Sequence, residues 1–443
     1  MSVSARQTAF SALMRVETAQ SYSNITLDSE LEKSGSSPRD RSFAAKLFYG
    51  VLENRLLLDY NVAVRSDRSL KEIDTGVMVL LRLGLYQLFF ADSVPARAAV
   101  NETVALCRSN GLGNASGFVN GILRSAANDM QLRLPDPKKS RTKYLSIKYS
   151  CPEKIVSLWR KSYGDEITLG VLSSLAERPP LCVRVNTLKI TAEGLRVSLE
   201  QSGVTAEPHK AVKDCLMLSG TGAIEALPQF REGLFHVQDS ASQLCCALLD
   251  PQEGDSLLDM CSAPGGKSFT CAELMKGKGN ITALDLYSAR LGLVKNGAER
   301  LGIDIISTRA CDASGFYGAL RADRVLSDVP CSGLGIIRRK PELRYKSDLG
   351  LEGLPELQYK ILCNASRFVK SGGRLLYSTC TLNPDENEKN AERFLGEHED
   401  FIPVPLTLPE GIERGKDERE NMLTLFPHIN GTDGFFISLF QRK

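Results

Sequence analysis

The segment LLDMCSAPGGK, residues 257–267, predicts a strand, a tight turn and a helix in immediate succession. Its first four residues are typical of a buried strand end, Pro264 to Gly266 form the turn, and a helix is expected from Lys267 to Met275. This arrangement brings backbone N–H groups and the positive end of a helix close to a ligand, and glycine, which has no Cβ, permits the close approach. The spacing matches neither G-x-G-x-x-G nor G-x-x-x-x-G-K-[ST], which disfavours a dinucleotide or a P-loop triphosphate. Alone, the segment fits an ordinary βα turn as well as a cofactor loop.

From Phe235 onward, apolar runs alternate with helical patterns, which is typical of βαβ units in a doubly wound sheet. An antiparallel hairpin at the sheet edge is expected at Phe435–Phe440, after Pro427 and a pair of glycines. The fold class is therefore α/β, with a mostly parallel, Rossmann-like sheet whose ligands bind outside the carboxyl ends of the strands. The other expected strands are Ser256–Cys261, Ile281–Leu286, Ile305–Arg309, Arg324–Asp328 and Arg374–Ser378.

Three further regions precede this sheet. Residues 1–134 carry apolar positions at helical spacing and predict an all-helical domain. Residues 135–150 form a basic linker that includes Lys138 and Lys139, expected to be extended, exposed and suited to contact nucleic acid. Residues 151–235 predict a small α+β domain, in which Arg184 and Asn186 face either a substrate or solvent, and residues 236–443 form the doubly wound domain.

Composition excludes several classes of protein. The formal charge of the 443 residues is only +2, so a nucleic-acid interface must come from local clusters. Twelve cysteines without a C-x-x-C pair, and only four histidines, argue against zinc and for reduced, mostly buried thiols. No apolar run is long enough to span a membrane and no targeting segment is evident, so a cytoplasmic, metal-free monomer is expected.

Polar residues gather at five successive strand ends. Asp285 ends the second strand, Asp312 follows the third and Asp328 ends the fourth. Cys331 follows the fourth strand and Cys380 the fifth, so the two thiols lie 380 − 331 = 49 residues apart in the sequence. Each aspartate alone is typical of a cap or turn, but together with the glycine turn they indicate a functional site.

The residues at these ends suit a nucleoside cofactor that carries no phosphate, and S-adenosylmethionine is such a molecule. A thiol beside it suits methylation of cytosine C5, because addition of a thiolate to C6 makes C5 nucleophilic, provided that the base is unstacked. These considerations leave the nucleophile open between the two cysteines. DNA cytosine methyltransferases use the Pro-Cys cysteine, which corresponds to Cys331.

The blocks DVPCSG at 328–333 and TC at 379–380, together with the turn at 261–267, resemble the Sun/Nop family of RNA cytosine-C5 methyltransferases. The helical N-terminus is similar to the NusB RNA-binding fold and residues 151–235 resemble an RRM-like domain. This combination is similar to that of bacterial enzymes that act on 16S ribosomal RNA. Ser262 and Val329 depart from the usual pattern, in which alanine is common at both positions.

The resemblance implies that Cys380 is the nucleophile, that Cys331 assists release of the methylated base, and that Asp328 contacts the cofactor and cytosine N3. It also implies that S-adenosylmethionine is held by Cys261, Ser262, Ala263, Pro264, Gly265, Gly266, Lys267, Asp285, Asp312 and Asp328.

A basic run beside the Pro-Cys loop is a candidate RNA clamp, with Tyr345 expected to stack on a base. Its proposed phosphate contacts are Arg338, Arg339, Lys340 and Arg344.

Two other functions compete with cytosine-C5 methylation of 16S rRNA. A non-catalytic RNA-binding ribosome-assembly or antitermination factor would need only the helical domain, and the presence of both thiols and all the strand-end acids argues against it. An amino-group methyltransferase is expected to carry Asn or Asp-Pro-Pro-Tyr-like residues at the fourth strand, where this chain has Val329-Pro330-Cys331.

Overall fold

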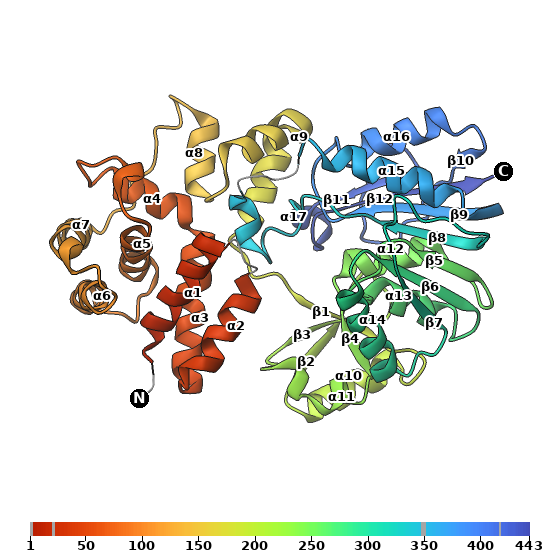
Figure 1. Cartoon of the computed structure of the whole chain (residues 1–443), viewed down its shortest axis with the longest axis horizontal. Coiled ribbons are helices and arrows are strands. Elements are labelled where there is room, and N and C mark those ends of the chain that lie inside the picture. Colours follow the sequence, from red (N-terminus) through yellow and green to blue (C-terminus); the bar gives the residue numbers. More distant parts are fainter. Residues whose placement is uncertain (1–2, 20–22, 347–350, 416–417) are drawn as a thin grey trace. The chain divides into compact units, whose positions relative to one another are not determined.

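The computed structural model describes residues 3–19, 23–346, 351–415 and 418–443. The chain folds into two compact units, of which unit 1 contains residues 1–177 and 337–347 and unit 2 contains residues 178–336 and 348–443. Figure 1 labels their helices and strands. The finer division predicted from the sequence, with boundaries near residues 134, 150 and 235, stays a prediction.

Unit 1 is helical, and α5 (Thr75–Phe90) lies at its centre. Asp74 caps this helix by accepting hydrogen bonds from the N–H groups of Gly76 and Val77. Residues 76–88 of α5 are buried against α1, α3, α4, α6 and α7, so the long apolar run seen in the sequence is a core helix. The helices of unit 1 are α1 (Ala5–Ala19), α2 (Ser23–Ser34), α3 (Pro38–Glu53), α4 (Arg55–Ala63), η1 (Leu70–Glu72), α5, α6 (Ala96–Ser109), η2 (Gly113–Ala115), α7 (Ser116–Asn128), α8 (Arg141–Lys148), α9 (Glu153–Ser174) and η4 (Pro341–Tyr345).

The basic linker is only partly extended, which corrects the prediction. The Ser140 hydroxyl accepts from the Lys143 N–H and starts the two-turn helix α8, which packs against α4 and α9. Lys138 and Lys139 lie in the turn before this helix and remain exposed.

The basic run after the Pro-Cys loop belongs to unit 1, and its structure contradicts the predicted clamp at three residues. Arg344 is buried and donates to the carbonyl oxygens of Glu53, Ser150 and Ile337. The Tyr345 hydroxyl bonds to Ser150, 2.9 Å from its carbonyl oxygen, so its ring is not free to stack on a base. Arg338 is buried as well. The Arg344 guanidinium is thus satisfied by backbone carbonyls inside unit 1, as a buried charge requires.

Unit 2 begins with a small antiparallel sheet in the order β2-β3-β1-β4. Arg184 and Asn186 are buried here, which rules out both predicted orientations: Arg184 pairs with Glu273, Nε to Oε2 2.8 Å, and Asn186 donates to the carbonyl oxygens of Gly233 and Leu301. The elements of this part are β1 (Leu181–Val185), α10 (Ala192–Gln201), β2 (Thr205–Pro208), β3 (Cys215–Ser219), η3 (Ile224–Ala226), α11 (Pro228–Arg231) and β4 (Phe235–Val237).

The large sheet of unit 2 has eight strands within the described residues, in the order β10-β12-β9-β8-β5-β6-β7, with β11 paired to β12. Strands β5 to β9 are parallel, and β12 joins β9 antiparallel at residues 436–441. The predicted antiparallel hairpin is formed by β12 with β11, but β12 is not the edge strand, because β10 and β11 pair with its other side. The strands are β5 (Ser256–Asp259), β6 (Asn280–Asp285), β7 (Ile306–Ala310), β8 (Ala322–Asp328), β9 (Val369–Thr379), β10 (Phe401–Pro403), β11 (Met422–Leu425) and β12 (Phe435–Arg442). The predicted fold class is confirmed.

Helices cover both faces of this sheet (Figure 1). Leu257 of β5 packs into a core with α12, α13 and α14, whereas the next residue, Leu258, packs into the core with α15 and α16. Successive strand residues point to opposite faces, so a strand buried on both sides reads as a continuous apolar run. The helices are α12 (Ser240–Leu249), α13 (Gly266–Leu274), α14 (Ser288–Leu301), α15 (Leu354–Ser366), α16 (Glu388–Glu397) and α17 (Pro427–Asn430).

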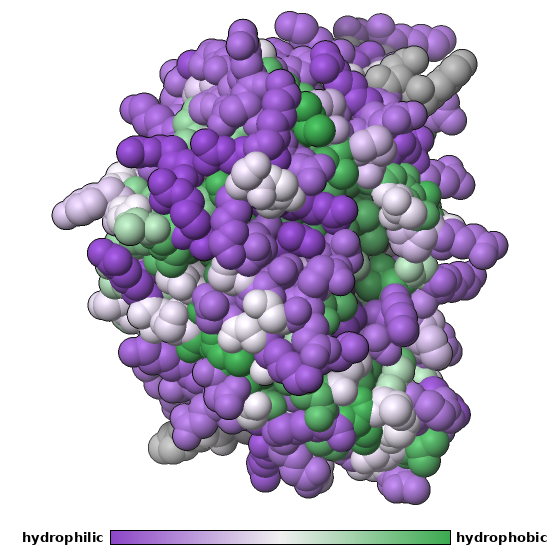
Figure 2. Space-filling model, turned by 90° about the vertical axis from the view of Figure 1, so that its right-hand side faces the viewer, coloured by the Kyte–Doolittle hydropathy of each residue, from purple (hydrophilic) through white to green (hydrophobic). Residues whose placement is uncertain are grey.

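The outer surface is mainly polar on the side that Figure 2 shows, where apolar side chains form small separate patches. Among the described helices, none combines the length and the apolar composition that crossing a membrane requires.

Candidate active site

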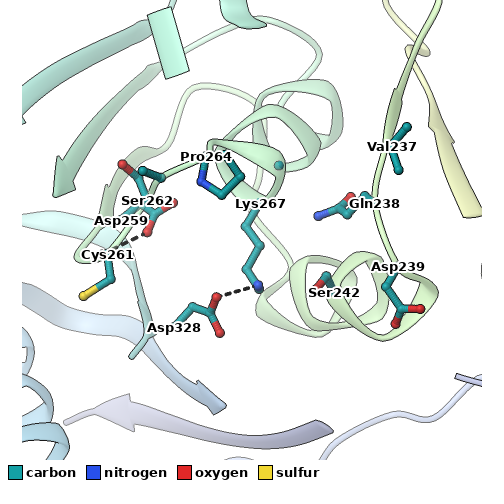
Figure 3. Close-up of a pocket in the computed structure, with 12 residues that line it drawn as sticks. Val237, Gln238, Asp239, Ser242, Asp259, Cys261, Ser262, Pro264, Lys267 and Asp328 are labelled. Atoms are coloured by element: carbon teal, nitrogen blue, oxygen red, sulfur yellow. Dashed lines mark hydrogen bonds and ion pairs between the residues drawn. The ribbon is translucent and has the colours of Figure 1, made fainter. Parts of the chain in front are cut away.

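A cavity of about 220 Å³ opens where β5 and β8 end, at the point where the strand order reverses. Figure 3 shows Lys267 reaching from the start of α13 to Asp328 at the end of β8. Ligands of doubly wound sheets bind at this position because the strand ends and the first turns of the helices diverge there. The cavity is lined by Val237, Gln238, Asp239, Ser242, Asp259, Cys261, Ser262, Ala263, Pro264, Gly266, Lys267 and Asp328.

Asp328 is the charged centre of this cavity. Its Oδ2 lies 2.6 Å from Lys267 Nζ, and its Oδ1 accepts from the Ser378 hydroxyl at 2.9 Å. Burial alone would lower the pKa of the Lys267 ammonium, but the Asp328 carboxylate outweighs burial and the pKa is raised. Lys267 therefore stays charged and fixes one carboxylate oxygen of Asp328.

Asp259 is the second carboxylate of the cavity and is only 1% exposed. Its Oδ2 accepts from the Ser268 hydroxyl at 2.7 Å. Burial raises the pKa of Asp259 to about 7, the Ser268 hydrogen bond opposes this rise, and the nearby Asp328 charge adds to it. Asp259 can therefore exchange a proton near neutral pH.

This raised pKa predicts a pH dependence of stability. Between about pH 4 and pH 7, folded Asp259 keeps a proton that the unfolded chain loses. Its contribution to the free energy of unfolding should therefore fall by up to about 1.4 kcal/mol per pH unit as pH rises. Asp259→Asn removes this contribution, so melting curves from pH 4 to 8 should show a steeper loss of stability in the wild type than in the variant. Parallel curves would contradict the assignment.

Within the described part of the chain, two buried polar atoms in the cavity wall have no hydrogen-bond partner: Gln238 Nε2 and Ser262 Oγ. The Gln238 carbonyl oxygen accepts from the Thr270 hydroxyl at 2.6 Å, which fixes the orientation of the amide. Unsatisfied buried polar groups are costly and rare, so these two atoms indicate that the cavity is shaped for a polar ligand. The sequence analysis missed Gln238, whose only sequence signal is a polar step before an apolar helix.

Gly265 is required for a different reason from the one predicted. Its φ is +113°, and a Cβ at this position would overlap the Phe269 ring. Glycine therefore allows the turn to close onto its own helix, rather than onto a ligand.

Asp285 and Asp312 lie outside the cavity lining. Asp285 is buried at the end of β6, accepts from the N–H groups of Ala263 and Tyr287, and pairs with Arg290 at 3.1 Å. Arg290 was not predicted, and it also donates to the Ala263 carbonyl oxygen at 2.8 Å. Asp312 is exposed and accepts from the N–H and hydroxyl of Ser314, which is a turn arrangement.

The Cys331 and Cys380 sulfur atoms lie 3.3 Å apart, although 49 residues separate them in the sequence. Both are half-buried. The hydrogen bond to Cys380, burial, and the charges of Cys380, Glu386 and Asp328 raise the pKa of the Cys331 thiol well above its ordinary range. The Cys331 thiol therefore keeps its proton near neutral pH.

All twelve cysteines are free thiols, and the described residues contain no group of three or more histidine, cysteine or acidic side chains arranged to hold a metal ion. The paired thiols follow the ends of β8 and β9. Asp328, which ends β8, lines the cavity, whereas neither cysteine is among the lining residues.

Comparisons with protein families find three matching regions, in the order that the sequence predicts: a helical domain, a small α+β domain and a methyltransferase domain. Residues 246–441 match the family described as 16S rRNA methyltransferase RsmB/F. Residues 3–128 match the NusB family, and residues 151–225 match the ferredoxin-like domain of RsmF/B-like methyltransferases. The RNA methyltransferase and NusB resemblances are confirmed.

Relatives align with almost the whole chain. The probable ribosomal RNA small subunit methyltransferase B of Bacillus subtilis is 36% identical and covers 99% of both chains. Its counterpart in Synechocystis is 38% identical over 98% of this chain and 99% of the relative, and the Escherichia coli O1:K1 enzyme is 30% identical over 97% and 96%.

Solved structures show the same architecture. The crystal structure of PH0851 covers 100% of both chains with a TM-score of 0.83 and 28% identity. NSun6 from Pyrococcus horikoshii with SFG covers 66% of this chain and 98% of its own, with a TM-score of 0.60; at 22% identity it shows the fold alone. The chain belongs to the RsmB/F family of 16S rRNA methyltransferases, which are S-adenosylmethionine-dependent enzymes.

Proposed function

We propose that this chain methylates C5 of a cytosine in 16S rRNA through a covalent bond between Cys380 and C6 of the base. The observation that supports this most directly is the 3.3 Å separation of the Cys380 and Cys331 sulfurs at two neighbouring strand ends. The names of the full-length relatives supply the substrate, the small-subunit ribosomal RNA. We place the reaction in the cytoplasm and assign it to the monomer.

S-adenosylmethionine fits the cavity between β5 and β8. Gln238 Nε2 and Ser262 Oγ offer hydrogen bonds that no atom of the described residues takes. The N-terminus of α13 and Lys267 offer positive charge to a carboxylate. Asp328 offers negative charge to an amino group or a sulfonium, and Asp259, which exchanges a proton near pH 7, also lines the cavity. When bound, this cofactor supplies an electrophilic methyl group. The proposal keeps the remaining predicted contacts at 261–267, Asp285 and Asp312, although the last two do not line the cavity.

The two thiols perform different steps. Cys380 as a thiolate adds to C6, which places electron density on C5 so that C5 can attack a methyl group. Asp328, held by Lys267 and Ser378, lies at the end of the strand next to that of Cys380 and is proposed to contact N3. Transfer of the C5 proton to a water molecule then forms the C5–C6 double bond again and expels the Cys380 thiolate. The Cys331 sulfur lies 3.3 Å from the Cys380 sulfur. The protonated Cys331 thiol can therefore donate a hydrogen bond to the Cys380 sulfur as it leaves.

Methyl transfer itself is the test of this function. Labelled S-adenosylmethionine and 16S rRNA should give 5-methylcytosine at a single mapped position. An assembly or antitermination factor would bind the same RNA and transfer no label.

Lys138 and Lys139 are proposed RNA contacts whose side chains are exposed, and Arg339 and Lys340 remain candidates as half-buried residues. We expect Lys138→Glu with Lys139→Glu to weaken 16S rRNA binding about tenfold or more near 0.1 M salt, and less at higher salt, because phosphate contacts depend on counterion release. Binding titrations at two salt concentrations measure this.

The matched control is charge reversal at the exposed lysines Lys278 and Lys295, which changes the net charge equally. Cofactor affinity should stay unchanged in both double variants. Equal loss of RNA binding in the two would assign the effect to net charge and remove Lys138 and Lys139 from the interface.

A further inference from the structure

Glu386 is a fully buried carboxylate whose hydrogen-bond partners within the described residues are neutral donors. Its Oε2 accepts from the Ser332 N–H at 2.9 Å and from Gln358 Nε2 at 2.8 Å. Its Oε1 accepts from the Ser332 hydroxyl at 2.5 Å and from Asn383 Nδ2 at 3.0 Å. Removing a carboxylate completely from water is expensive, and four donors are what this site supplies in return.

These four bonds join the two loops that carry the thiols. Ser332 directly follows Cys331, whereas Glu386 and Asn383 belong to the loop that follows Cys380. Gln358 comes from α15 and also donates to the Pro330 carbonyl oxygen at 2.9 Å, so it holds the first loop from the other side.

Further hydrogen bonds join the same two loops. The Thr381 hydroxyl lies 2.7 Å from the Ser332 hydroxyl and accepts from the Leu334 N–H at 3.2 Å. The Gly335 N–H donates to the Cys380 carbonyl oxygen at 3.1 Å. A Cβ on Gly335 would overlap the Gly434 carbonyl oxygen, so this close approach depends on glycine. Glu386 is the one charged group among these contacts.

Glu386 contacts neither thiol directly in the described structure, so it acts through Ser332. We propose that Glu386 is a positioning residue that locks Ser332, and with it the Cys331 thiol, beside Cys380. This inference rests on the proposed function of the thiol pair. Its negative charge also adds to the hydrogen bond with Cys380 and to burial in raising the pKa of the Cys331 thiol.

Glu386→Gln is the variant that tests this role. The substitution keeps the side-chain shape but replaces one acceptor oxygen by an NH₂ group, which cannot accept from Ser332, Gln358 or Asn383. The loop that carries Cys331 should therefore become less well ordered. With labelled 16S rRNA and S-adenosylmethionine, we expect steady-state turnover to fall about 30-fold while the KM for the cofactor changes less than threefold. Covalent protein–RNA adduct should accumulate, as expected when Cys331 no longer assists release.

Two further variants, measured alongside Glu386→Gln, distinguish a failure of this inference from a failure of the proposed function. Cys331→Ala should accumulate adduct to a similar level. The matched control Glu388→Gln removes another largely buried carboxylate two residues away, whose side chain accepts from the Thr424 hydroxyl and, among the described residues, has no hydrogen bond to Ser332 or Asn383. It should behave like the wild type.

A second readout does not depend on turnover. Iodoacetamide labelling of the RNA-free protein, with Cys331 and Cys380 quantified by peptide mass spectrometry, should show Cys331 of Glu386→Gln reacting at a pH lower by about one unit. An unchanged profile for Cys331 together with wild-type adduct levels overturns the positioning role. If Cys331→Ala also forms no adduct, the proposed function itself fails.

Ser332→Ala covers the case in which Glu386→Gln does not fold. This variant removes one of the two donors that Ser332 gives to Glu386 and keeps the backbone N–H bond. It should accumulate adduct to a smaller extent than Cys331→Ala. Wild-type adduct levels in a folded Ser332→Ala protein would contradict the proposal.

Discussion

Cys380→Ala is expected to abolish methyl transfer to 16S rRNA, with a loss on the order of 10⁴-fold. Without a thiolate at C6, cytosine C5 remains a poor nucleophile, and no other step in the proposed mechanism replaces that activation. Single-turnover transfer of label from S-adenosylmethionine measures the loss, and denaturing gels should show no covalent adduct.

The Cys331→Ala variant provides the informative contrast. It should still form the adduct because Cys380 remains, and RNA should stay attached to the protein. Cys363→Ala on α15 is the matched control, a half-buried thiol whose neighbour is His398 at 3.4 Å, and it should retain activity within about threefold. Adduct in Cys380→Ala and none in Cys331→Ala would reverse the two roles.

Asp328→Asn is expected to reduce methyl transfer by about 10² to 10³-fold. The substitution leaves the Lys267 ammonium in a buried site without its carboxylate at 2.6 Å and removes the acid proposed to meet cytosine N3. Calorimetric titration with S-adenosylmethionine, alongside the rate measurement, separates loss of cofactor binding from loss of the chemical step.

Asp323→Asn is the matched control because Asp323 lies on the same strand at its opposite end. Its carboxylate also pairs with a lysine, 2.8 Å from Lys370 Nζ, and this pairing together with hydrogen bonds from Ser256 overcomes burial and lowers the Asp323 pKa to about 2. This variant should lose stability at neutral pH and keep its rate within about threefold. A rate for Asp328→Asn as high as that of Asp323→Asn would remove Asp328 from the mechanism.

The sequence was sufficient for the central strands because burial on both faces leaves an unmistakable pattern. Leu257 and Leu258 point into different cores, yet both must be apolar, and the glycine turn that follows marks the strand end. The acids and thiols follow the ends of these strands in the sequence. They could be predicted to lie at one edge of the sheet, because parallel strands have their carboxyl ends at the same edge.

Short strands escaped prediction for the opposite reason. The three residues of β4 and the four residues of β11 are too few to establish a period of two. Each is defined by its partner strand, β1 or β12, which only the folded chain brings alongside.

The basic run at 338–346 shows the limit of reasoning from charge. Glu342 receives hydrogen bonds from Ser23, 319 residues away in sequence, and Arg344 reaches carbonyls of residues 53 and 150. The local sequence does not distinguish an arginine that is buried against backbone carbonyls from an exposed arginine that binds phosphate. The sequence analysis missed Glu386 and Gln238 for the same reason. Their hydrogen-bond partners Ser332 and Thr270 lie 54 and 32 positions away in the sequence.

The covalent step can be observed most directly with 16S rRNA that contains 5-fluorocytidine. Fluorine at C5 cannot leave as the proton does, so after methyl transfer the bond from sulfur to C6 should persist. Digestion and mass spectrometry of the trapped complex should place the modified nucleotide on the peptide containing Cys380, only when S-adenosylmethionine is present. A nucleotide attached to Cys331, or no adduct from protein that methylates ordinary 16S rRNA, would contradict the mechanism.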